Sequence, residues 1–329
     1  MAATDYDAAC RAAARSAGVR RPRCGRSELD SPSRLFNNPT MSARLQVLLA
    51  AVCFGTTGTA QAIGPGGSPV AVGAARIVFG GLLLVLVARG LRVRLPRRGA
   101  PLIGMAMAVA VYQLSFFAAV RLTGVAVGTV VAIGTGPAAA GVLGRLVNGE
   151  RLSARWAQAT ALAAVGVLLL AGDGGASVDP TGVALAVTSG VGYATYTVLT
   201  KRMLDAGEAP EGVMAAGFGG AGLLLAPALI VAGPGFLATP GGLALAVYLA
   251  AVPTALAYVL FSRGLRHLSS GETATIVLAE PLTAAALGVV ALGEHPSLAA
   301  GIGALLVLAG LLVLAAPGRR RLAPAGAPA

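Results

Sequence analysis

Two ionisable residues, Arg76 and Glu280, lie deep inside long apolar stretches of the sequence. A charged side chain in a bilayer is costly, so it needs a partner or a water-filled cavity. Burial disfavours a charged carboxylate, whereas a nearby guanidinium favours it. We therefore expect Arg76 to attract a substrate carboxylate and Glu280 to accept a proton or a substrate amine. The alternatives are a fixed ion pair between two helices or, for Arg76, a side chain that reaches outward to the membrane surface.

Other polar and aromatic residues within these stretches are candidates for lining a binding site. Threonine hydroxyls often bond to carbonyls of their own helix, so a purely structural role is the alternative. The candidates are Thr57, Tyr112, Gln113, Tyr193, Tyr196 and Tyr258.

Two prolines and two glutamates are expected to shape the helices. Proline removes a backbone donor, and a membrane helix tolerates this where the freed carbonyls line a cavity or meet other partners. We predict helix breaks at Pro137 and Pro281, with a simple packing kink as the alternative. Glu150 and Glu294 lie in turns, where we expect them to cap the helices that follow. A gating role for these glutamates is the alternative.

The elements that must position these residues are membrane-spanning helices. The chain has 329 residues, of which 56% are hydrophobic and 12% are charged, whereas soluble domains carry roughly 25% charged residues. One crossing of a bilayer takes roughly 20 apolar residues. The sequence predicts an all-α integral membrane protein with ten transmembrane helices, at 44–62, 68–88, 101–120, 124–144, 154–171, 181–200, 212–232, 241–261, 271–291 and 297–315.

Basic residues are distributed unevenly between the two sides of these spans. With the N-terminus in the cytoplasm, the outer loops keep only Arg121, because nearly all other arginines fall on the cytoplasmic side. We therefore predict a multi-pass protein of the plasma membrane with both termini cytoplasmic. Residues 1–43 are predicted to be a disordered basic tail, and residues 316–329 a C-terminal tail. The net charge of +12 indicates contact with anionic membrane lipids rather than with nucleic acid.

The two halves of the sequence resemble each other. An odd number of helices per repeat makes the second copy enter the membrane in the opposite sense, so we predict two inverted five-helix repeats, residues 44–171 and 181–315. Inverted repeats are typical of secondary transporters, whose substrate site lies near the membrane midplane. The matching residues, at an offset of 144 positions, include Pro137 and Pro281, Gly149-Glu150 and Gly293-Glu294, and Ser153 and Ser297.

These motifs resemble the EamA type of the drug/metabolite transporter superfamily. Its pattern is a proline in the fourth helix of each half followed by a Leu-Gly-Glu-like turn. In addition, Ala279-Glu280-Pro281-Leu282 resembles the Glu-Pro motif of the threonine/homoserine exporter branch. The resemblance implies alternating access and export of a small metabolite such as an amino acid, coupled to protons.

Other classes of function have less support in the sequence. No Gly-x-x-x-x-Gly-Lys-Ser/Thr motif is present, so we expect neither a nucleotide cofactor nor ATP as the direct energy source. The cysteines and the two histidines do not have metal-ligand spacing, so we expect no metal site. We predict that the chain is not an enzyme. A multi-pass membrane enzyme or lipid-handling protein and a channel remain the alternatives, and both a monomer and a homodimer stay open.

Overall fold

The computed structural model describes residues 39–96, 99–170, 179–293, 295 and 297–316. From Ser42 onward the described residues belong to one compact unit. The predicted tails, residues 1–43 and 316–329, therefore lie almost entirely outside the described residues. Glu294 also lies outside them.

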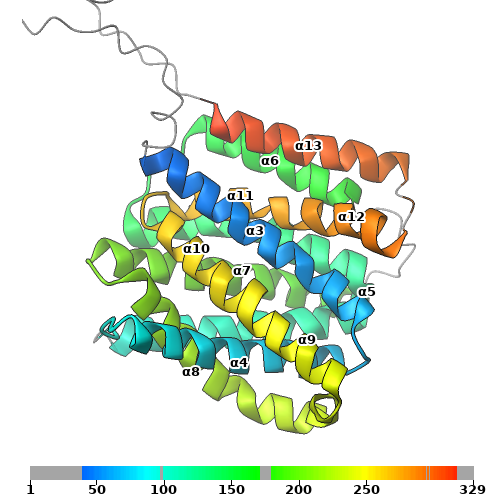
Figure 1. Cartoon of the computed structure of the whole chain (residues 1–329). Coiled ribbons are helices and arrows are strands. Elements are labelled where there is room, and N and C mark those ends of the chain that lie inside the picture. Colours follow the sequence, from blue (N-terminus) through cyan, green and yellow to red (C-terminus); the bar gives the residue numbers. More distant parts are fainter. Residues whose placement is uncertain (1–38, 97–98, 171–178, 294, 296, 317–329) are drawn as a thin grey trace, which may run out of the picture. The chain divides into compact units, whose positions relative to one another are not determined.

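Helices make up almost all of the described chain (Figure 1). Two short helices differ from the rest, because η1 is a 3-10 helix and η2 is a π-helix. The helices in chain order are α3 (Pro39–Ile63), α4 (Pro69–Gly90), α5 (Gly99–Asn148), α6 (Ala154–Leu170), α7 (Pro180–Asp205), α8 (Pro210–Ala232), η1 (Pro234–Ala238), α9 (Pro240–Ala250), η2 (Ala251–Leu256), α10 (Ala257–Leu265), α11 (Ser270–Val277), α12 (Ala279–Leu292) and α13 (Leu298–Ala315).

Within the described residues these helices combine into ten apolar spans. α5 supplies two of them, because its backbone leaves helical geometry at Gly124 (φ 79°, ψ 164°). The stretch from α9 to α10 forms one span, Pro240–Leu265, and α11 and α12 together form another, Ser270–Leu292. Nine spans have at least 18 residues, and α6 is the tenth with 17 residues. The predicted all-α membrane fold with ten spans is therefore confirmed.

The turns that precede α6 and α13 are built in the same way. Gly149 and Gly293 both have a φ of 69°, a left-handed conformation that ends the preceding helix at little cost because glycine lacks a Cβ. Ser153 and Ser297 then cap the next helices, since each hydroxyl accepts a hydrogen bond from the backbone N–H three residues on, at 3.0 and 3.1 Å. The repeat in the sequence is thus a repeat in the structure.

Equivalent helices of the two halves pack on each other. The second helices, α4 and α8, are in contact, and so are the fifth helices, α6 and α13 (Figure 1). At the α6–α13 contact, a Cβ on Gly166 would lie 2.6 Å from the carbonyl oxygen of Gly303. Small residues allow such close backbone approach between membrane helices. Because successive spans alternate in direction, α6 and α13 run antiparallel, as inverted repeats require.

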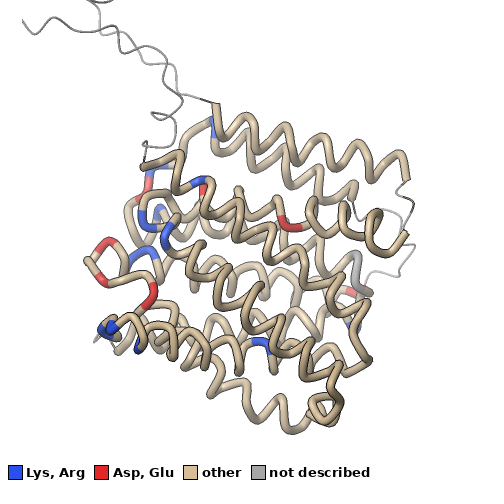
Figure 2. Tube along the Cα trace, viewed as in Figure 1, with Lys and Arg blue, Asp and Glu red and all other residues tan. Residues whose placement is uncertain are grey.

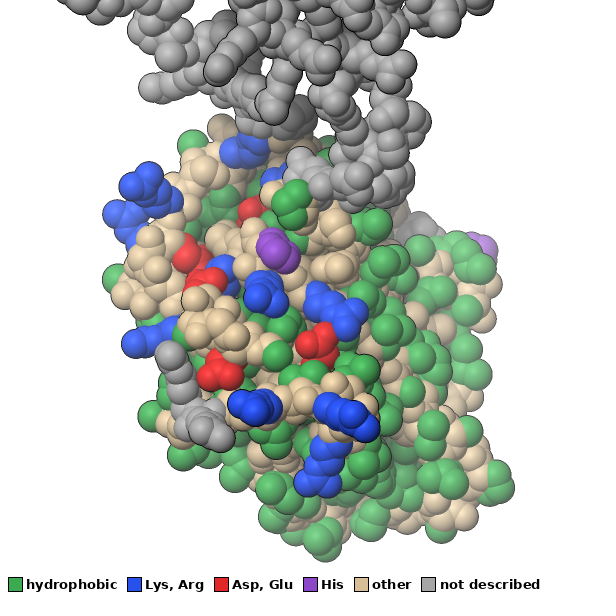
Figure 3. All heavy atoms as spheres, turned by 60° about the vertical axis from the view of Figure 1, so that its left-hand side comes forward, with side chains coloured by type: hydrophobic (Ala, Val, Ile, Leu, Met, Phe, Trp, Pro, Cys, Tyr) green, Lys and Arg blue, Asp and Glu red, His purple; other side chains and the backbone are tan. Residues whose placement is uncertain are grey.

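Basic side chains gather at one end of the described helices (Figures 2 and 3). We call it the basic end, and it includes the first turns of α3 and α11 and the last turns of α4, α7 and α10. Among the described residues, this end holds the ion pairs Arg44–Glu272 (2.7 Å), Lys201–Asp205 (2.6 Å) and Arg263–Glu211 (2.6 Å).

Candidate functional site

Arg76 projects from α4 toward Gln113 on α5. The guanidinium donates from Nη2 to Oε1 of Gln113 at 3.4 Å, and Nε2 of Gln113 donates to the carbonyl of Gly73 at 3.3 Å. Gln113 is buried, so it links the two helices and orients the guanidinium at the same time. The Nε donor of Arg76 is buried without a hydrogen-bond partner in the described chain. Arg76 therefore retains unused donor capacity.

Four tyrosines from three helices meet beside Arg76. The hydroxyls of Tyr112 on α5 and Tyr258 on α10 are 3.2 Å apart. The ring of Tyr196 on α7 lies 5.8 Å from that of Tyr112, 5.2 Å from that of Tyr193 and 6.2 Å from that of Tyr258. Tyr112, Tyr196 and Tyr258 are close enough to Arg76 to interact electrostatically with its guanidinium. We call Arg76, Gln113 and these four tyrosines the polar cluster.

The hydroxyls of Tyr193 and Tyr196 are buried without hydrogen-bond partners among the described residues. A buried hydroxyl without a partner costs free energy, so such groups call for an explanation such as a missing ligand or water. The polar cluster therefore offers several donors that a bound molecule would satisfy.

Phenylalanines that were not predicted from the sequence complete the aromatic surroundings. The ring of Phe218 on α8 lies 4.0 Å from that of Tyr258, and Phe54 on α3 lies 5.0 Å from it. Phe261 packs on Tyr196 and Tyr258 at 6.2 Å. No local pattern in the sequence indicates these contacts, because the three phenylalanines come from three different spans.

Glu280 lies where the ninth span is interrupted. α11 ends at Val277 and α12 begins at Ala279, so the break falls at Leu278. Pro281 has no N–H to donate to the carbonyl of Val277. At the break itself, the N–H of Leu278 donates to the carbonyl of Thr275, three residues earlier, at 3.1 Å, which is a tighter turn than in an α-helix. The missing donor of Pro281 makes the break possible, and the break places the carboxylate of Glu280 in the first turn of α12.

The carboxylate of Glu280 has no hydrogen bond or ion pair within the described part of the chain, although its residue is half-buried. Arg76 is likewise in none of the ion pairs found there. The two charges are near enough to act on each other, and Glu280 also acts on Tyr193. The fixed ion pair that we considered from the sequence is thus not formed, and two opposite charges stand unpaired around the polar cluster.

Thr57 is not brought into the polar cluster by any described contact. Its hydroxyl is buried without a partner on α3. Two residues earlier, Gly55 packs directly on the break, because a Cβ at this position would lie 2.7 Å from the carbonyl oxygen of Glu280 and 2.6 Å from Cβ of Thr283. α3 thus supports the break mainly through a glycine that sequence reasoning did not single out as a site residue.

The helix break expected at Pro137 is not present. α5 continues through Pro137, and its non-helical residue is Gly124. Pro253 does distort its span, because it lies in the π-helix η2. There the hydroxyl of Thr254 donates to the carbonyl of Leu249 at 2.7 Å, which satisfies the acceptor that the missing proline N–H leaves free.

We expected Glu150 to cap the helix that follows it, but this prediction was wrong. Ser153 caps α6, whereas the carboxylate of Glu150 accepts hydrogen bonds from the backbone N–H of Ser270 at 2.8 Å and from its hydroxyl at 2.7 Å. Glu150 therefore caps α11, which belongs to the other half. Spacing along the sequence cannot show a partner 120 residues away.

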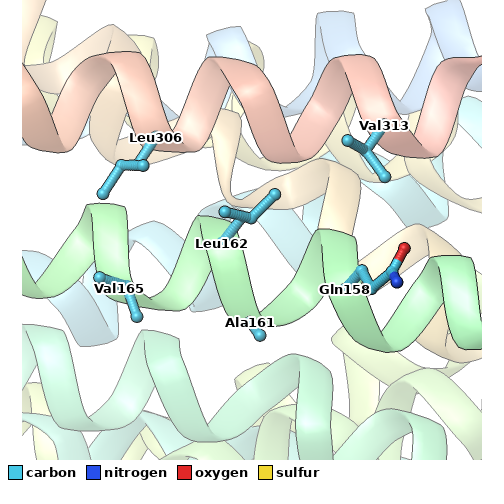
Figure 4. A pocket seen from close by; sticks show the side chains of 6 residues that line it. All are labelled: Gln158, Ala161, Leu162, Val165, Leu306 and Val313. Carbon is cyan, nitrogen blue, oxygen red and sulfur yellow. The ribbon is translucent and has the colours of Figure 1, made fainter.

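A surface groove between α6 and α13 is separate from the polar cluster (Figure 4). It measures about 460 Å³ and is almost entirely apolar, which suits hydrocarbon chains rather than a polar solute. Its lining consists of Gln158, Ala161, Leu162, Val165, Leu306 and Val313.

Comparison with known proteins assigns the family. The profile described as the EamA-like transporter family matches residues 41–172 and again residues 180–316. The chain belongs to the EamA-like transporter family. It is therefore a multi-pass membrane transporter of the drug/metabolite transporter superfamily with two repeated halves, and the predicted resemblance is confirmed.

Individual relatives of this EamA-like transporter agree with that assignment. It is 40% identical over 283 residues to the uncharacterized transporter YwfM of Bacillus subtilis, across 84% of this chain and 95% of the relative. It is 31% identical over 137 residues to the uncharacterized inner membrane transporter YicL of Salmonella typhimurium, across 41% and 45% of the two chains. A solved crystal structure with 22% identity shares the fold, with a TM-score of 0.74 over 83% of this chain and 96% of the other.

Proposed function

We propose that this EamA-like transporter is a secondary active transporter that exports a small zwitterionic metabolite, such as an amino acid, in exchange for protons. Transport proceeds by alternating access between two inverted halves, and it changes no covalent bond of the solute. The observation that carries this proposal is a pair of opposite charges, Arg76 in the polar cluster and Glu280 near it, neither of which has an ion-pair partner among the described residues.

An amino acid complements this arrangement group by group. Its carboxylate would accept from the free Nε of Arg76 and from tyrosine hydroxyls, and its ammonium group would meet the carboxylate of Glu280. When the solute leaves, a proton on Glu280 would neutralise the carboxylate in its half-buried position. Solute and proton would then occupy Glu280 in turn, and this competition is the simplest form of proton exchange.

The charge distribution supports a location in the cell membrane with the basic end in the cytoplasm. Arginine and lysine are enriched in the cytoplasmic segments of membrane proteins, and they gather at one end of the described helices (Figure 2). With ten spans, both termini lie on that same side. One relative is named as an inner membrane transporter.

The proposal is tested with purified protein in liposomes, using labelled amino acids and an imposed pH gradient. We expect saturable flux of at least one amino acid that responds to the gradient and falls roughly a hundredfold in Arg76→Gln, because removing one partner of a desolvated charge pair costs a few kcal/mol. The control is Arg89→Gln, at the end of the same helix α4. Absence of flux with every metabolite, together with a lipid-modifying activity, would overturn the proposal.

A further inference from the structure

The first turn of α11 is where the two halves are tied together at the basic end. Glu150, from the first half, uses both carboxylate oxygens to hold Ser270, at 2.8 Å and 2.7 Å. Arg44, also from the first half, holds Glu272 through Nε at 2.9 Å and Nη2 at 2.7 Å. Ser270 is fully buried, and the other three residues are partly buried, so these charge-assisted bonds are incompletely screened by water.

α11 connects this tie to the proposed site. The helix has eight residues and ends at Val277, four residues before Pro281. From Ser270 to Glu280 the chain advances about 15 Å at the rise of an α-helix. Because the break interrupts the ladder at Leu278, α11 can tilt without moving α12 as one rigid rod.

Two polar groups near the Glu150–Ser270 contact lack hydrogen-bond partners in the described chain. The hydroxyl of Thr273 and the indole N–H of Trp156 are both buried without a hydrogen bond. The indole nitrogen of Trp156 lies against Gly271 of α11, and Thr273 is one turn beyond Ser270 on the same helix. Such groups are costly when dry, and water would satisfy them if the basic end opened. Their position therefore fits a surface that is covered in one state and hydrated in another.

We propose that Glu150 and Arg44 form a latch on the first turn of α11 and that release of this latch opens the basic end of the transporter. The inference rests on the alternating access of the proposed function, but it does not depend on the solute. In the latched state the Glu150–Ser270 and Arg44–Glu272 contacts cover Thr273. In the released state α11 tilts away from the first half, and water reaches Thr273 and Trp156.

The test measures how fast a cysteine at Thr273 reacts with a small maleimide in lipid nanodiscs. The reporter Thr273→Cys is introduced after Cys10, Cys24 and Cys53 have been replaced by serine. Because Thr273 is 0% exposed, the parent should react slowly. Glu150→Gln should raise the rate roughly tenfold, since a lost bond to a charged group shifts a two-state equilibrium by about that factor.

Asp205→Asn is the matched control, because this carboxylate also lies at the basic end but pairs with Lys201 within α7 alone. Its reaction rate should stay within about twofold of the parent, since exposed pairs contribute little. Ser270→Ala is a second variant, which removes one of the two bonds without changing a charge, and it should raise the rate by an intermediate factor. If Glu150→Gln fails to fold, the labelling rate of Ser270→Ala tests the latch in its place.

Equal rates in the parent, Glu150→Gln, Ser270→Ala and Asp205→Asn would overturn the latch. A parent that already reacts as fast as an exposed cysteine would do the same. The measurement needs no substrate, so it separates the latch from the proposed function. If amino acids are transported but the rates are equal, only the latch fails; if no amino acid is transported but Glu150→Gln accelerates labelling, only the solute assignment fails.

Discussion

The fourth span around Pro137 and the ninth span around Pro281 occupy equivalent places in the two halves, yet they differ in structure. α5 continues through Pro137, whereas the ninth span breaks at Leu278. The residue before the proline is Gly136 in the first half and Glu280 in the second. Gly136 lets the ring of Tyr193 lie against the helix, and Glu280 supplies a charge. The duplicated scaffold has thus been kept while the site has become asymmetric.

The difference also shows that a proline alone is not sufficient to break a helix. Proline occupies equivalent positions in the two halves but accompanies a break in only one of them. The residues packed around the proline therefore determine whether the helix breaks. At the break, α3 packs its Gly55 directly on the carbonyl of Glu280. Helix breaks in membranes persist where neighbouring elements or a cavity accommodate the freed backbone groups. We infer that the contact with α3 is part of what stabilises the broken form.

The largest effect is expected when the close contact between α3 and the break is disrupted. In Gly55→Ala a Cβ would lie 2.6 Å from Thr283 and 2.7 Å from the backbone of Glu280, so α3 must move away. We expect transport to be lost and the free energy of unfolding in detergent to fall by about 3 kcal/mol. Gly58→Ala, on the same helix with open space around it, should be neutral. Equal thermal stability of the two variants would show that α3 does not support the break.

A smaller effect is expected at the equivalent position in the first half. In Gly136→Leu the added Cβ lies 3.2 Å from the ring of Tyr193, so the longer side chain must displace that ring from the polar cluster. Solute flux at subsaturating concentration should fall roughly tenfold, the equivalent of 1.4 kcal/mol. Gly134→Leu is the control, because nothing lies within 4 Å of a Cβ there. If both variants transport equally, Tyr193 has no part in solute binding.

The smallest effect is expected where the two halves are still alike. Ser153→Ala and Ser297→Ala each remove one N-cap hydrogen bond. Each should lower the free energy of unfolding by about 1 kcal/mol and leave the Michaelis constant of transport unchanged. Unfolding in detergent and flux in liposomes measure the two quantities. A clear difference between the two variants would show that the scaffold, and not only the site, has diverged.

The spans could be predicted from the sequence because an apolar run is a local feature. An apolar run long enough to cross a bilayer must be helical, since the backbone has no other partner there. The turns at Gly149 and Gly293 could be predicted from nearby residues, but sequence reasoning assigned the caps to Glu150 and Glu294, whereas Ser153 and Ser297 cap the next helices. Charged residues inside apolar runs, Arg76 and Glu280, were recognisable for the same reason, because their cost demands a role.

What could not be predicted depends on contacts between distant segments. Pro137 and Pro281 lie at equivalent positions of the repeat, and the packing of Gly55 on Glu280 is a contact between distant segments that the sequence does not show. The carboxylate of Glu150 lies 120 residues from Ser270 along the chain, and nothing local indicates that pairing. Phe218 lies in a helix that is apolar on every side, so the sequence does not show which face meets the polar cluster.

The central claim is that Glu280, rather than its counterpart Gly136, couples solute to protons. The most direct test compares two fluxes of Glu280→Gln in liposomes: exchange of labelled for unlabelled solute, and accumulation driven by a pH gradient. The account predicts that exchange continues at a reduced rate, because the amide oxygen can still accept a hydrogen bond from the ammonium group. Accumulation falls to background and loses its pH dependence, because the amide can neither bind nor release a proton. Glu208→Gln, in the turn between α7 and α8 at the basic end, should leave both fluxes unchanged. Accumulation by Glu280→Gln with the parent's rate and pH dependence would contradict the account.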